Sequence, residues 1–80
     1  MSEQVMHVVQ QFERQGKRLV AGRQMPFKSS GAAISRAERD AARCAGVVAV
    51  QTRIDTESGE VLDEPIILAR FGELPAELAS

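Results

Sequence analysis

Several residue types that carry chemistry are scarce in this sequence. It has one cysteine, one histidine and three phenylalanines, and it has no tryptophan or tyrosine. A single cysteine excludes a disulfide within the chain and a cysteine-based metal cluster. With so few aromatic rings, the core has to be built mainly from Val, Ile, Leu, Met and Ala side chains.

Long apolar runs are also missing. The longest lie at residues 47–50 and 66–69, and both are far shorter than the roughly 20 residues that span a bilayer. Residues 1–13 do not have the charged and apolar pattern of a secretion signal. We therefore expect no membrane partner and a cytoplasmic location.

The composition is that of a globular protein, with 44% hydrophobic and 26% charged residues among 80. A chain of this length has room for one core, so we expect a single domain over residues 1–80. Domains of this size bury only about 60% of the surface of the unfolded chain. Because a second subunit would add buried surface, we expect a homodimer.

The net charge of −1 conceals an uneven distribution. Residues 1–43 contain eight basic and four acidic residues, whereas residues 44–80 contain two basic and seven acidic ones. This asymmetry is typical of proteins with a nucleic-acid surface or an acidic tail, and it can equally bring two halves of a fold or two subunits together. It concerns the choice of partner more than the fold.

The first third of the sequence predicts a β-hairpin with its turn at Gly16. Residues 5–13 have apolar side chains on both faces, which indicates a central strand. In the second strand, residues 18–28, Gly22 indicates a β-bulge and Pro26 places the far end of the strand at a sheet edge. One face of this strand is expected to carry Leu19, Ala21, Arg23, Met25 and Phe27.

An alanine-rich helix is predicted over residues 30–45. Ser29 and Ser30 are suitable N-caps, and Gly46 has the place of a left-handed residue after the helix. The three- and four-residue spacing predicts a buried stripe of Ile34, Ala37, Ala41 and Cys44, flanked by Ala33 and Ala45. The charged side chains are expected to face away from the sheet: Arg36, Glu38, Arg39, Asp40 and Arg43. An ion pair is expected between Arg36 and Asp40, which are four residues apart.

Two further strands are expected at residues 47–54 and 61–71, the second interrupted near Pro65 because proline cannot donate to a strand ladder. Residues 73–80 contain two leucines one helical turn apart, Leu74 and Leu78, which is typical of a short helix or a flexible tail. The order of elements is β-β-α-β-β. The predicted fold class is α+β, with one helix on a four-stranded, mainly antiparallel sheet.

No set of residues in the sequence predicts catalysis. His7 lies between apolar neighbours, and Cys44 lies near the predicted C-terminus of the helix, where the dipole does not activate a thiol. The acidic loop at residues 55–60 lacks the spacing of an EF-hand, and no glycine-rich phosphate loop occurs. We therefore expect no catalytic residue, no metal site, no cofactor and no enzymatic activity.

One group of basic residues could contact an anion or a nucleic acid: Lys17, Arg18, Arg23, Lys28, Arg36, Arg39 and Arg43. The three arginines from the helix fall on one side of it. Against this hypothesis, acidic residues are interspersed, no tyrosine or tryptophan is present for stacking, and the pI is near 5.8. We favour a protein-interaction or regulatory module that forms a homodimer, and nucleic-acid binding through the basic hairpin and helix is the alternative.

Overall fold

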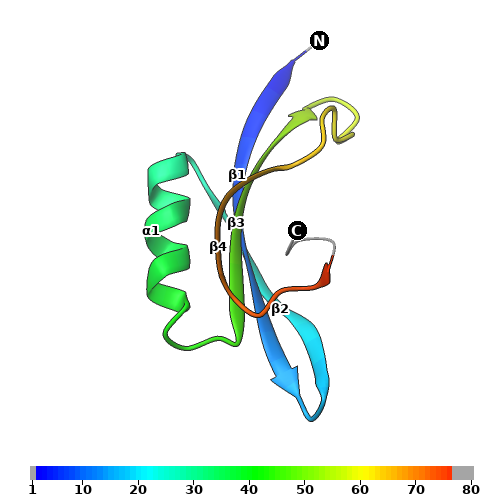
Figure 1. Cartoon of the computed structure of the whole chain (residues 1–80). Helices are drawn as coiled ribbons and strands as arrows, with labels where there is room; N and C mark the ends of the chain where they lie inside the picture. Colours follow the sequence, from blue (N-terminus) through cyan, green and yellow to red (C-terminus); the bar gives the residue numbers. More distant parts are fainter. Residues whose placement is uncertain (1, 77–80) are drawn as a thin grey trace.

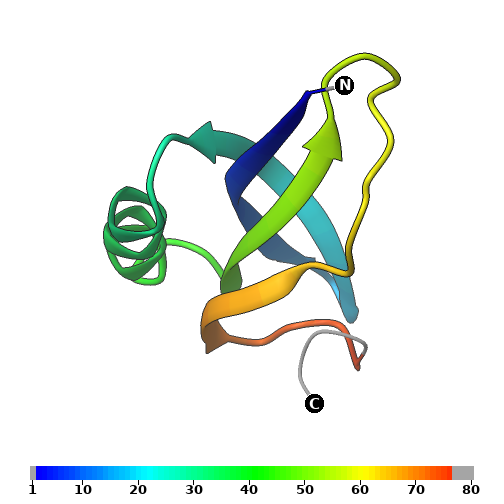
Figure 2. The ribbon, with the colours of Figure 1, turned by 90° about the horizontal axis from the view of Figure 1, so that it is seen from above.

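The computed structural model of the chain describes residues 2–76, which contain four strands and one helix (Figure 1). The elements are β1 (Glu3–Gln15), β2 (Arg18–Phe27), α1 (Ser30–Asp40), β3 (Gly46–Asp55) and β4 (Ile66–Gly72). The strands form one antiparallel sheet with the order β2-β1-β3-β4. The helix lies on one face of this sheet (Figure 2), so the predicted α+β fold is confirmed.

The first two strands form a long hairpin, and Gly16 has a φ of +64° in its turn. β1 lies between β2 and β3, so the prediction of a central strand is confirmed. The register of β1 and β2 shifts opposite Gln11, where Gly22 and Arg23 face one residue of β1. This shift is the predicted β-bulge.

The bulge changes which residues of β2 share a face. Ala21 pairs with Phe12, whereas Met25 pairs with Val9. Because neighbouring residues of β1 point to opposite faces, Ala21 lies on the face opposite Met25. The prediction of one alternating face from Leu19 to Phe27 is therefore wrong, because the extra residue of the predicted bulge was not taken into account when the faces were assigned.

The helix begins where the sequence predicts and ends earlier. The Ser29 hydroxyl accepts a hydrogen bond from the Ala32 amide at 3.1 Å, which is an N-cap. The helix stops at Asp40, whose carbonyl accepts hydrogen bonds from the amides of Arg43 and Cys44 in a tight turn. Gly46 is not a left-handed end residue but the first residue of β3, because sheet pairing outweighs the local helix preference of residues 41–45.

The helix packs closely on the sheet because its buried positions carry small side chains. Ala33 and Ala37 are fully buried against Val9, Val47 and Ala49. Of the predicted stripe, Ala37 is confirmed. The other members are half-buried, and the last two of them follow the helix: Ile34, Ala41 and Cys44.

The last strand begins after the predicted interruption. Only an isolated bridge joins Val61 to Ile54, and regular pairing with β3 starts at Ile66, directly after Pro65. At the other end of β4, Gly72 pairs with Gly46, and the Glu73 amide donates to the Ala45 carbonyl at 2.9 Å. The predicted tail segment extends to residues 77–80, which lie outside the described residues.

Candidate interaction surfaces

The three arginines of the predicted helix stripe come together in the structure. They line one hollow of about 340 Å³ on the flank of α1, together with two neighbours on the same segment: Arg36, Arg39, Asp40, Ala42 and Arg43. The carboxylate of Asp40 makes this hollow less basic than the sequence indicates.

Asp40 is buried, with a relative exposure of 6%, although the sequence predicts that it faces solvent. Its Oδ2 atom accepts a hydrogen bond from Gln11 of β1 at 2.8 Å, and Arg36 Nε lies 3.0 Å from both carboxylate oxygens. The predicted ion pair between Arg36 and Asp40 is thus confirmed. Asp40 turns inward because these two donors replace the water that its oxygens would lose on burial.

The pKa of Asp40 reflects opposing effects. Burial raises it, and the hydrogen bonds from Gln11 and Arg36, together with the positive charges of Arg36 and Arg43, lower it by more. The net result is a pKa below the usual value of an aspartate. The carboxylate therefore stays charged at neutral pH, and Arg36 is engaged with it rather than available to an external anion.

The remaining basic residues do not join the helix arginines. Lys17 lies in the turn between β1 and β2, Arg18 begins β2, and Arg23 lies in its bulge. Lys28 precedes the helix and lines a different hollow. The seven candidate residues are therefore spread over the hairpin and both ends of α1.

The acidic part of the chain forms a turn that stabilises itself. The Asp55 carboxylate accepts from the Glu57 amide at 2.8 Å, and the Ser58 hydroxyl accepts from the Glu60 amide at 3.2 Å. Gly59, with a φ of +76°, donates to the Asp55 carbonyl. Within residues 2–76, no group of three or more metal-ligating side chains comes together.

The only histidine and the only cysteine both lie at the edge of the core. His7 is half-buried on the helix side of β1, and its Nδ1 atom is buried without a hydrogen-bond partner. Cys44 packs against the core, and burial raises the pKa of its thiol. A raised pKa leaves little thiolate, so Cys44 has no activated nucleophile character.

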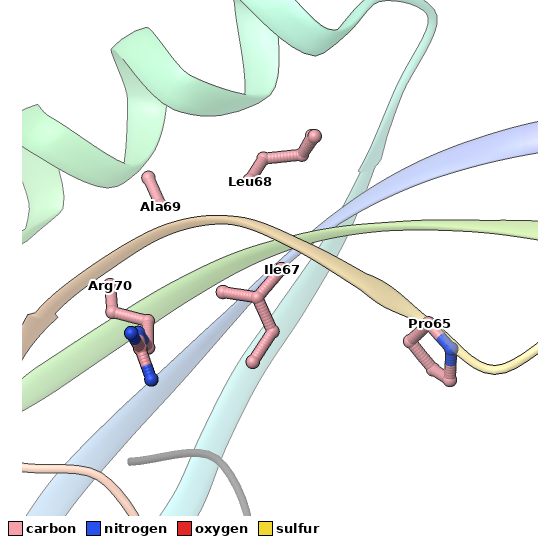
Figure 3. Close-up of a pocket in the computed structure, with 5 residues that line it drawn as sticks. All are labelled: Pro65, Ile67, Leu68, Ala69 and Arg70. Carbon is pink, nitrogen blue, oxygen red and sulfur yellow. The ribbon is translucent and has the colours of Figure 1, made fainter. Parts of the chain in front are cut away.

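A hollow of about 590 Å³ runs along β4 (Figure 3). Leu68 and Ala69 point toward the helix, and Ile67 and Arg70 point to the other side of the strand. Its lining comes from a single segment, residues 65–70, so it is a shallow surface along the strand and not an enclosed site.

One surface was not predicted from the sequence. β2 pairs with β1 only from His7 onward, whereas β3 pairs with β1 from Glu3. Residues 3–6 of β1, which we call the open end, therefore have a neighbouring strand on one side only. A hollow of about 390 Å³ lies beside them and is lined by Gln4, Val5, Met6, Pro26, Phe27 and Lys28.

Four large apolar residues are exposed in the part of the chain that the structure describes. They are Val5, Val61, Leu62 and Ile66, with relative exposures of 45%, 60%, 39% and 58%. The register places Val5 and Leu62 on either side of Arg53 in β3. Val61 pairs with Ile54, and Ile66 pairs with Gln51. The sequence did not predict this surface, because it does not show which strands are neighbours in the sheet.

Among the residues that the structure describes, no helix has the length and apolar character needed to cross a membrane. Comparisons with protein-family models, with curated proteins and with solved structures find no match for this chain.

Proposed function

We propose that this chain is a small binding module that acts through protein contacts and associates with itself, and that it is not an enzyme. The observation that carries the proposal is the exposure of four large apolar side chains, of which Val5 lies where β1 lacks one neighbour: Val5, Val61, Leu62 and Ile66. Exposed apolar residues beside an unpaired strand are typical of protein–protein contacts.

The size of the core supports self-association. The fully buried apolar side chains are small, and the largest of them are valines: Val9, Val47 and Val48. A core of this kind stabilises a short chain only modestly, and burial of additional apolar surface against a second subunit would strengthen it. The cytoplasm, where a lone thiol stays reduced, is the location that the proposal assumes.

Sedimentation velocity over a range from micromolar to millimolar concentration tests the proposal. We expect the mass to rise from one chain of 8.7 kDa toward two with increasing concentration. Replacement of Val5 by Ser at the open end should weaken association, whereas Ala32→Ser on the exposed surface of the helix should not. A single-chain mass at every concentration would refute self-association.

Nucleic-acid binding is the second candidate, and the hollow shared by Arg36, Arg39 and Arg43 favours it. Phosphate contacts by Arg39 and Arg43, which are not paired with Asp40, would produce a steep loss of affinity with salt. Retention on immobilised RNA or DNA at low salt, reduced in an Arg39→Gln, Arg43→Gln variant, would support this function. The absence of retention at low salt would exclude it and leave the protein-contact proposal unaffected.

A further inference from the structure

We propose that the binding partner at the open end of β1 is a second copy of this chain, and that residues 3–6 of the two copies pair as antiparallel strands. This inference rests on the proposed self-association and names the surface that carries it. It follows from the direction of the backbone groups, the shape of the neighbouring hollow and the charges at its rim.

The backbone of the open end has hydrogen-bonding groups that face away from β3. The Thr56 amide donates to the Ser2 carbonyl at 3.0 Å, so even-numbered residues of β1 direct their backbone groups toward β3. Because direction alternates along an antiparallel strand, Glu3 and Val5 direct their amides and carbonyls to the opposite side. No described strand lies there, since β2 ends at Phe27, opposite His7.

A second open end satisfies these groups with twofold symmetry. When Gln4 lies opposite the partner's Gln4, Glu3 of each copy faces the partner's Val5, and both residues of each pair direct their backbone groups at each other. An interface in which the same segment serves both copies is the usual arrangement of a homodimer. The side chain of Val5, 45% exposed in the single chain, would be covered.

Charge at the rim of the hollow favours this occupant. Among the residues that line the hollow, Lys28 carries the only charge, and it follows directly after the last paired residue of β2. Within one chain, the exposed Glu3 carboxylate lies 3.2 Å from Arg53. In the symmetric pairing, Glu3 of each copy turns from this contact to the partner's Lys28. Two equivalent ion pairs of opposite charge therefore form across the interface.

The acidic loop does not oppose this arrangement. Residues 56–65 connect β3 to β4, and β3 lies on the side of β1 away from the open edge. The β1 strands of both copies thus lie between the like charges of the two loops.

The edge formed by β2 differs from the open end in ways that discourage pairing. It contains the bulge at Gly22, a proline at position 26 and the basic residues Arg18 and Arg23. These are features that prevent edge strands from pairing with other chains. Residues 3–6 of β1 have no proline, bulge or basic residue.

Charge exchange tests the ion pairs between the copies. Lys28→Glu and Glu3→Lys should each raise the dimer dissociation constant by about tenfold or more, because each variant places like charges at both contacts. An equimolar mixture of the two variants should form a heterodimer with an affinity near that of the parent. In that heterodimer both contacts again join opposite charges. If a substitution weakened the dimer only by damaging the fold of its own chain, mixing the two variants would not restore the affinity.

A proline substitution tests the backbone pairing. The Val5 amide faces the open edge, so Val5→Pro removes no hydrogen bond within the sheet and should leave the unfolding midpoint of the monomer nearly unchanged while it weakens the dimer. The matched control is Gln4→Pro, which removes an amide that faces β3 and should lower the midpoint clearly. Circular dichroism of each variant verifies the fold.

The outcomes separate this inference from the proposed function. A parent that is dimeric, with variants that remain as dimeric as the parent, would overturn pairing at the open end and leave self-association in place. A parent that is monomeric at all concentrations would overturn both. Loss of the dimer in the single variants and recovery in their mixture is the result that supports the inference.

Discussion

The two parts of β1 have different surroundings although they belong to one continuous strand. Residues 7–15, which we call the closed half, have β2 on one side, and β3 pairs on the other side as far as Phe12. The open end has β3 alone. Val9 and Phe12 in the closed half are buried, whereas Val5 at the open end is 45% exposed. The comparison indicates that the closed half contributes more to the core of the fold than the open end does.

The largest loss of stability is expected at the contact between Gly46 and the residues after β4. A Cβ atom at position 46 would overlap the Glu73 backbone, which is itself bonded to Ala45. Gly46→Ala should lower the free energy of unfolding by about 4 kcal/mol or more, because backbone atoms on both sides would have to move. Urea unfolding measures the difference.

Gly31→Ala is the matched control for that substitution. Gly31 lies in the first turn of α1, with no atom within 4 Å of an added Cβ. The substitution should be neutral or stabilise by up to about 1 kcal/mol. Equal losses at positions 46 and 31 would show that the close contact beside the closed half has no special importance.

A smaller effect is expected where the helix meets the closed half. Ala37 is fully buried, so Ala37→Leu should overpack the contact with the sheet and cost about 1–3 kcal/mol. Ala32→Leu places the same side chain on the exposed surface of the same helix and should change stability by less than about 0.5 kcal/mol. The prediction is wrong if thermal melting finds the variant at position 37 as stable as the parent.

Asp40 connects α1 to the closed half through Gln11, and its lowered pKa predicts a pH dependence. The unfolded chain binds the proton more readily, so the contribution of Asp40 is present above about pH 4 and is lost as the pH falls below that value. Asp40→Asn should reduce stability by about 1.5 kcal/mol at neutral pH. The difference should shrink in acid, whereas a constant difference at all pH values would contradict the assigned charge.

The smallest effect is expected at Arg53 of β3, which lies beside the open end. Arg53 lies 3.2 Å from Glu3 and 2.6 Å from Asp63, with all three side chains largely exposed. Exposed ion pairs contribute little and are screened by salt. Arg53→Met should shift the unfolding midpoint only slightly, and the shift should vanish at high salt. A loss as large as that at Gly46 would mean that the open end also supports the fold.

Sequence reasoning predicted the features that depend on neighbouring residues along the chain. The Ser29 cap, the bulge at Gly22 and the break at Pro65 each follow from the conformational or hydrogen-bonding properties of one residue. The order of elements followed from the same local patterns.

The errors concern features that depend on the neighbours in space. The end of the helix at Asp40 depends on Gly46 joining the sheet, and the burial of Asp40 depends on Gln11 reaching it from β1. The open end depends on β2 stopping at Phe27 while β3 continues to Asp55. None of these pairings can be derived from spacing alone, because they require the order and register of the strands.

The continuous pairing of β1 with β3 has a consequence for the thermodynamics of association. Residues 3–6 are already extended and hydrogen-bonded to residues 52–55. A partner strand therefore meets a backbone whose conformational entropy was lost when the monomer folded, and only its side chains remain to be ordered. Association at such a preorganised edge should be limited by collision and orientation, without a slow folding step before it.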